Sequence, residues 1–254
     1  MKIIGFAQLH NERLNGNLQN WFACMRPLCD FIYIYDQASN DGSVEYYESQ
    51  KNVVVIRSNV NDFPREIICK GILLRKLLSD HPDATAILWV DGDTILERAF
   101  TRQAVEELLM NSSADMFSFG HYNLWRSDCF YRIDSKYHGL NGKVIALWRN
   151  NGKLHFPEEL GLHKSQNPLG IERLERCPFS LIHRGFATDA QIFRKYGRYK
   201  SFGQSGWALQ RLLNEKGLNV VELPDILPEW FPVTDPDDPR TKAPLLQLEE
   251  QMES

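Results

Sequence analysis

An apolar run, residues 86–90, stops abruptly at two carboxylates, Asp91 and Asp93, which Gly92 separates. A short apolar run of this kind is typical of a buried parallel strand, and the carboxyl edge of such a sheet is where ligands bind in open α/β folds. The glycine lets the backbone turn sharply, so both carboxylates can face one point. Converging carboxylates repel each other unless a cation lies between them or one keeps a proton. The sequence therefore predicts a divalent metal and, with it, a phosphorylated ligand.

The composition limits the class of protein. The chain has 254 residues, 43% of them hydrophobic and 24% charged, which suits one large α/β domain or a domain with a subdomain. A net charge of -4 argues against nucleic acid as the main partner, because proteins that bind the phosphate backbone are usually basic. Five cysteines without a Cys-x-x-Cys pair indicate neither a zinc site nor a disulfide framework.

The expected location is cytoplasmic. The cysteine pattern favours reduced thiols. The apolar residues 1–9 are cut short by four polar residues and have neither the length nor the cleavage site of a signal peptide. No apolar run approaches the length needed to cross a bilayer, so we expect no transmembrane segment.

Strand and helix patterns alternate in the first half of the chain. The predicted strands are residues 2–9, 31–35, 53–57 and 86–90, and the predicted helices are residues 14–29, 44–49 and 64–78. This order predicts a mostly parallel sheet with right-handed crossovers.

The second half is less regular. We predict helices at residues 101–110, 187–196 and 205–216, strands at 115–122, 143–148 and 179–183, and a loop at 155–178. Proline and aspartate mark residues 231–254 as a C-terminal arm or a disordered tail.

Three short motifs in order suggest a family. Asn11-Glu12 follows the first predicted strand, residues 33–42 read YIYDQASNDG, and residues 89–93 read WVDGD. Together they resemble the family 2 glycosyltransferases with the GT-A fold, over roughly residues 1–125 and more loosely to about 230. The resemblance implies a GT-A type α/β fold: a Rossmann-like, mostly parallel sheet flanked by helices. It also implies a nucleotide-sugar-binding half (residues 1–125) and an acceptor-binding half of the same domain (residues 126–230).

The resemblance implies a metal-dependent transferase. Such enzymes move a sugar from a nucleotide diphosphate, here a UDP-sugar, to a glycan or other hydroxyl acceptor, and we expect inversion at the anomeric carbon. A metal bridging the phosphates would stabilise the charge of the leaving group. Asp93, with Asp91 directly or through water, would hold the ion, and His183 at the end of a predicted strand would complete the site. A site with imidazole favours Mn²⁺, with Mg²⁺ as the alternative. His183 could instead be an ordinary strand-end histidine.

In the same family the residue at Asp36 accepts a hydrogen bond from the base, typically from uracil N3–H, although Asp36 could also simply stabilise a turn. Asp41 could bind the donor or cap the following helix. The other donor-binding candidates are Asn11, Glu12, Arg57, Arg65, Lys70 and Asp91. Arg65 and Lys70 lie where family members often carry a glycine-rich segment with Arg-Asn, a pattern that this chain does not have.

The catalytic base is predicted in the second half, because inversion needs a carboxylate that takes the acceptor's proton. Glu158 and Glu159 follow Pro157 at an expected helix start, where the helix dipole also favours carboxylates for structural reasons. They are preferred over Asp134 and Glu172. Aromatic residues of the stretch 122–137 could stack on sugars or belong to the core.

Two other functions stay open. A phosphohydrolase of the haloacid dehalogenase type also needs Asp-x-Asp after a strand, but on its first strand, and here three predicted strands precede the motif. A catalytically silent carbohydrate-binding protein could keep the same fold. A calcium loop of the EF-hand kind does not fit, because Ile95 and Arg102 stand where it needs oxygen ligands.

Overall fold

The computed structural model describes residues 1–61, 63–132, 144–160, 167–205, 209, 212 and 220–222. The strands are β1 (Ile3–Leu9), β2 (Phe31–Gln37), β3 (Val53–Ser58), β4 (Ala86–Trp89), β5 (Thr94–Leu96), β6 (Met116–Asn123), β7 (Phe130–Arg132), β8 (Val144–Arg149), β9 (Leu174–His183) and β10 (Val220–Glu222). The helices are α1 (Leu18–Met25), α2 (Ser43–Ser49), the 3₁₀ turn η1 (Phe63–Arg65), α3 (Glu66–Asp80), α4 (Arg102–Asn111) and α5 (Asp189–Ser201).

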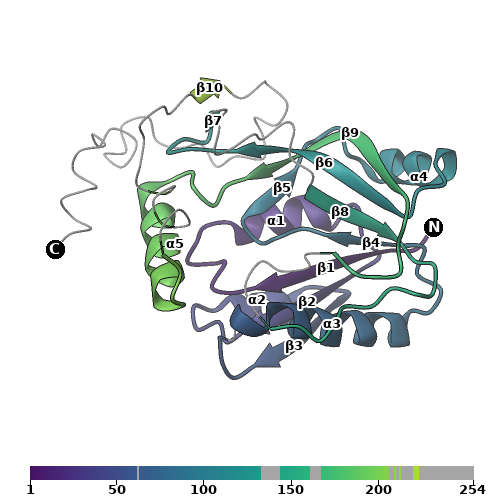
Figure 1. The fold of residues 1–254 in the computed structure, drawn as a ribbon, viewed down its shortest axis with the longest axis horizontal. Coiled ribbons are helices and arrows are strands. Elements are labelled where there is room, and N and C mark those ends of the chain that lie inside the picture. The colour runs from purple at the N-terminus through teal and green to yellow at the C-terminus, as the bar shows by residue number, and fades with distance from the viewer. Residues whose placement is uncertain are drawn as a thin grey trace.

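Eight strands form one sheet in the order β3-β2-β1-β4-β8-β6-β9-β5, and β7 pairs with β10 apart from it (Figure 1). The strands β3, β2, β1 and β4 are parallel. Beyond β4 the pairings are mixed: β4 with β8, β8 with β6 and β5 with β9 are antiparallel, while β6 with β9 is parallel. The expected α/β class is confirmed, but the expectation of a mostly parallel sheet is wrong, because the second half of the chain makes it a mixed one.

The helices cover both faces of the sheet. In β1, Ile3 and Ala7 face a core that includes Trp21 of α1 and Val105 of α4. The alternate residues of β1 face a second core, built with α3 and closed by Trp148 and Phe156 (Ile4 and Phe6 with Ile67, Leu73 and Leu77). This alternation is the period of two that a strand buried on both sides requires. Helix α5 lies on neither face but at the end of the sheet toward which β1 points (Figure 1).

The second half differs most from expectation. Strand β9 begins at Leu174, so the predicted loop at 155–178 is wrong at its end, where Leu174 pairs with Met116 of β6. The sequence patterns did not predict β5, β7 and β10. Residues 157–160 are not helical, so the helix start expected after Pro157 is not there. The predicted arm at 231–254 and most of the helix at 205–216 lie outside the described residues.

Helix α1 is shorter than the predicted 14–29. Asn11 and Gly16 have positive φ angles of 54° and 71°, and the backbone between them forms turns instead of helix. In the described part of the chain, the longest helix is α3 with 15 residues. No described helix has both the length and the apolar character that crossing a membrane would need.

Candidate functional site: a cationic cavity at the end of the sheet

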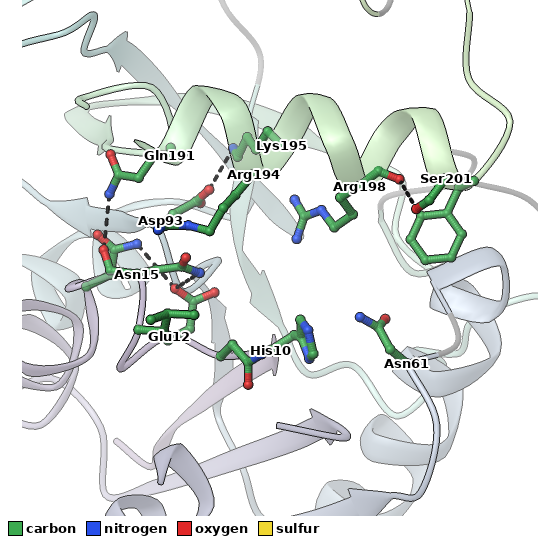
Figure 2. Close-up of a pocket in the computed structure, with 15 residues that line it drawn as sticks. His10, Glu12, Asn15, Asn61, Asp93, Gln191, Arg194, Lys195, Arg198 and Ser201 are labelled. Atoms are coloured by element: carbon green, nitrogen blue, oxygen red, sulfur yellow. Dashed lines mark hydrogen bonds and ion pairs between the residues drawn. The ribbon is translucent and has the colours of Figure 1, made fainter. Parts of the chain in front are cut away.

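A cavity of about 290 Å³ opens where β1 and β4 end (Figure 2). The loop after β1 lines it with His10, Asn11 and Glu12, and the turn after β4 lines it with Asp93. One face of α5 closes the opposite side with Gln191, Arg194, Lys195, Arg198 and Ser201, spaced as successive turns of a helix require. The cavity therefore lies at the carboxyl edge that the apolar run 86–90 predicted for a ligand.

Helix α5 is fixed at its start. Thr188 and Gln191 form a reciprocal capping box, in which the Thr188 hydroxyl accepts from the Gln191 backbone and the Gln191 side chain accepts from the Thr188 backbone. The Gln191 amide also donates to the carbonyl of Asn15, at 3.2 Å, which ties the helix to the loop after β1. These bonds set the distance between the basic face of α5 and the end of the sheet.

Asp93, His183 and Lys195 meet at one point. Lys195 Nζ lies 2.7 Å from Asp93 Oδ2 and 2.9 Å from His183 Nε2, and those two acceptor atoms are 3.3 Å apart. The pairing of β5 with β9 brings the two ends together, because Thr94 is opposite His183 in the register. The sequence prediction had placed both Asp93 and His183 at this site, and the structure brings them into contact.

The hydrogen bonds of His183 define its tautomer. Its Nδ1 lies 3.0 Å from Asn123 Oδ1, which can only accept, so Nδ1 carries the proton. The lone pair of Nε2 then faces Lys195. Burial lowers the pKa of the neighbouring His121 to about 3, so His121 is neutral.

Two glycines make room for these contacts. A Cβ on Gly185 would lie 2.0 Å from Lys195 Nζ and 2.5 Å from Asp93 Oδ2. A Cβ on Gly92 would lie 2.6 Å from the Glu12 side chain. Any larger residue at either position would push the charged groups apart.

The two carboxylates that line the cavity differ in charge state. Burial alone would raise the pKa of Asp93, but the adjacent Lys195 ammonium outweighs it and holds that pKa well below its usual range. Burial raises the pKa of Glu12 to about 7, and the Asp93 carboxylate adds to the shift. The Asn17 amide donates a hydrogen bond to Glu12 at 3.2 Å, which opposes this rise in pKa. Near neutral pH, Asp93 is therefore the carboxylate that carries a full charge.

Arg198 has a donor that no acceptor in the described part of the chain engages. Its Nε is buried and has no hydrogen-bond partner within the described residues, although the guanidinium lies 4.5 Å from the centre of the Phe63 ring. Asn61 Oδ1, which lines the same cavity, is likewise buried without a partner in that part of the chain. Buried polar atoms normally have partners, so these two atoms point to a polar ligand.

Several predicted donor-site residues are engaged elsewhere. Both oxygens of Asp36 accept from Ser39, at 2.9 and 2.6 Å. The Asp41 carboxylate accepts from the backbone of Leu14 and Ser43, and so holds the loop after β1 against the start of α2. Asn11 lines the cavity and bonds Asn40 with its side-chain amide.

The predicted basic residues lie outside the described cavity. Lys70 is buried, pairs with Glu66 at 2.8 Å and lies 3.9 Å from the Trp89 ring centre. Arg57 pairs with Glu48 on the surface. Arg65 is exposed at the end of η1.

Asp91 is exposed as a residue, but nearby protein atoms partly desolvate its carboxyl. This desolvation raises the pKa of the carboxyl to about 6. The Lys70 ammonium opposes this rise and the Asp93 charge adds to it. Of the base candidates, Glu158, Glu159 and Glu172 are exposed and are not among the residues that line the described cavity. Asp134 lies outside the described residues.

The basic residues of α5 were not singled out from the sequence. Residues 187–196 were predicted to be helical, but no role was given to Arg194, Lys195 or Arg198. The available signal was their spacing, which puts three cations on one side of a helix that follows His183.

The predicted metal site can be tested against this geometry. Two neighbouring ligands of one octahedral ion, each about 2.1 Å away, lie about 3 Å apart, and Asp93 and His183 have nearly that spacing. However, the Lys195 ammonium already contacts both atoms, so an ion would fit only if Lys195 moved away. Across the described residues, no cluster of three or more His, Cys, Asp or Glu side chains could hold an ion. The Mn²⁺ site of Asp91, Asp93 and His183 stays a prediction.

Comparison with known proteins adds little. No family model and no curated protein matches the sequence. Among solved structures, the chain is similar to the crystal structure of a mycobacterial protein, with 16% sequence identity and a TM-score of 0.31. That match covers 48% of this chain and 41% of the mycobacterial one, and it carries no argument about function.

Proposed function

We propose that this protein is a glycosyltransferase that binds a nucleotide diphosphate sugar in the cavity beside α5. The observation that carries this proposal is the convergence of Arg194, Lys195 and Arg198 on a cavity at the carboxyl ends of β1 and β4. Arginine and lysine are the side chains that bind phosphate groups most effectively. The cavity of about 290 Å³ is close to the lower limit for small-molecule sites, so it suits the diphosphate part of a nucleotide.

The chemistry follows from the charges. When the bond between the anomeric carbon and the diphosphate oxygen breaks, its electron pair stays on the diphosphate. The acceptor oxygen bonds the anomeric carbon, and the hydroxyl proton passes to a base, for which Glu158 and Glu159 stay predictions. Cations fixed beside the diphosphate stabilise the charge that it gains, without reorganisation during the reaction. Arg198 Nε would find in a phosphate oxygen the acceptor that it does not have in the described protein.

The nucleoside would extend toward β2. Asp36 lies in β2, opposite Leu9 at the end of β1, and a carboxylate has about four lone-pair sites, so the bonds from Ser39 leave capacity for an imide N–H. This supports uridine as the first choice of base. The acceptor-binding role of residues 126–230 and the inverting outcome stay proposals of the same kind.

Isothermal titration with UDP and GDP tests the proposal. We expect Arg198→Ala to weaken binding at least about tenfold, because the variant removes a charge-assisted contact to phosphate. The matched control is Lys200→Ala, which removes an exposed charge from the same helix but not from the cavity lining, and should change affinity less than about twofold.

Two other outcomes would assign a different function to the protein. If neither nucleotide binds and the protein releases phosphate from an aryl phosphate, the protein is a phosphohydrolase and not a glycosyltransferase. If sugars bind but nucleotides do not, the protein is a silent carbohydrate-binding module. Release of UDP or GDP from the bound donor, dependent on an acceptor hydroxyl, would establish the transferase.

A further inference from the structure

We propose that the Lys195 ammonium takes the place of a divalent metal ion and is the cation that binds the donor's diphosphate, so that donor binding needs no metal. This inference rests on the proposed function and names the group at the centre of that site. It differs from the sequence-based expectation of Mn²⁺ held by Asp91, Asp93 and His183.

The position of the ammonium is the first argument. Lys195 Nζ lies 2.7 Å from Asp93 Oδ2 and 2.9 Å from His183 Nε2, the two atoms that a metal would have to coordinate. The Phe186 ring centre lies 4.5 Å away on a further side, which favours a cation. The side chain is only 12% exposed, so its stem is packed and the ammonium is held in place.

The residues around Lys195 leave room for its ammonium and orient His183 toward it. Gly185 has no Cβ, and a Cβ there would come within 2.0 Å of Nζ. Asn123 Oδ1 accepts a hydrogen bond from His183 Nδ1, so Nε2 is the ring nitrogen that faces the ammonium. Asp93 and His183 therefore both lie within hydrogen-bond distance of one positive charge, and the charges of Asp93 and Lys195 balance.

The ammonium still has capacity for a ligand. It has three N–H donors, and Asp93 and His183 take two of them. Lys195 also lines the cavity, from which a phosphate oxygen can reach the third. A protonated amine then stabilises the electron pair that the diphosphate keeps when the sugar leaves, with no proton transfer from the lysine.

The charge of the cavity supports the same role. Even if Glu12 and Asp93 were both ionised, Arg194, Lys195 and Arg198 would outnumber them by one positive charge before any ion is added. A nucleoside diphosphate is an anion, so it enters a lining that already attracts it. The two arginines would contact the outer phosphate oxygens while Lys195 holds the centre.

The test is titration of UDP and GDP into the full chain in EDTA and in millimolar Mn²⁺. We expect the wild-type Kd to differ less than about threefold between the two conditions, and Lys195→Met to weaken binding in EDTA at least about tenfold. Methionine keeps the length and packing of the stem. The matched control is Lys200→Met, which should bind within about twofold of the wild type.

Gly185→Ala provides a second variant that keeps the lysine. The added Cβ would lie within 2.6 Å of the side-chain ends of Lys195, Asp93 and His183 and push the ammonium out of this position, so binding in EDTA should fall as in Lys195→Met. Thermal melting of each variant checks the fold. Should Lys195→Met fail to fold, Gly185→Ala decides the question by itself.

Each result separates the two proposals. Nucleotide binding that requires Mn²⁺ overturns the role of Lys195 but leaves the proposed function. Binding in EDTA that survives both Lys195→Met and Gly185→Ala also overturns it. Absence of binding in both conditions overturns the proposed function itself.

Discussion

Gly92 matters at the residue scale because it lets Glu12 lie against the turn between Asp91 and Asp93. A Cβ at this position would lie 2.6 Å from Glu12 and 2.7 Å from Leu9, both of which are buried. We predict that Gly92→Ala lowers the free energy of unfolding by about 1–3 kcal/mol, as overpacking of a closed interior does. Urea unfolding of the variant and the wild type measures this change in stability.

Gly197 is the matched control for that variant. It lies inside α5, and a Cβ there would meet nothing within 4 Å. Gly197→Ala should therefore stabilise the protein by about 0.5–1 kcal/mol, through the backbone entropy of the unfolded chain. Equal stability of Gly92→Ala and the wild type would show that Glu12 does not pack against the turn.

Asp41 gives a pH-dependent prediction at the same scale. Burial alone would raise the pKa of Asp41, but hydrogen bonds from Ser43 and Leu14 outweigh it and hold the pKa below its ordinary value of 3.8. A lowered folded-state pKa contributes stability that is fully present above the ordinary value and is lost as pH falls through the folded pKa.

We therefore predict that Asp41→Asn is about 1 kcal/mol less stable than the wild type at neutral pH, because the amide replaces only part of the hydrogen bonding. The difference should shrink as the pH falls below about 4, where the wild-type carboxyl takes up a proton. Denaturant unfolding at several pH values measures this. A difference that stays constant down to pH 2 would contradict the assigned hydrogen bonds.

At the scale of elements, α5 carries the cations, so its first turn is the part to test. Thr188→Ala removes the capping hydroxyl and should cost about 1 kcal/mol of stability. It should also weaken UDP binding, because Gln191 and the basic face of the helix lose their anchor. Thermal melting and titration of the same samples measure both effects.

Helix α4 offers the control. Thr101 caps it by accepting from the backbone of Ala104 at 3.2 Å, and neither residue lines the cavity. Thr101→Ala should lose similar stability and leave nucleotide affinity unchanged. If both caps affect binding equally, the loss reflects general destabilisation and not the position of α5.

The first-half elements were predictable because their signals are local. Apolar runs of four to seven residues separated by helical patterns predicted β1 to β4 and the three helices among them. Strand β5 gives no such signal, since its three residues follow directly on Asp93 and depend on pairing with Leu181–His183. The start of β9 at Leu174 likewise depends on β6, because its first residues are mostly exposed and charged.

At the scale of the whole molecule, strand pairing between segments far apart in the sequence determines the features that local patterns did not predict. Strand β8 enters antiparallel between β4 and β6, which makes the sheet mixed. The pairing of β5 with β9 brings His183 to Asp93, two residues that the sequence analysis had assigned to the same site. Lys195 was missed because a lysine on an amphipathic helix usually faces solvent, and only its packing against Asp93 distinguishes it.

The central claim is that the basic face of α5 and the end of the sheet together bind a nucleoside diphosphate. A crystal structure of the protein grown with UDP tests it most directly. We predict diphosphate density between Arg194, Lys195 and Arg198, with Arg198 Nε bonded to a phosphate oxygen. Density for the nucleotide at another place on the protein, with this cavity holding only water, would contradict the account.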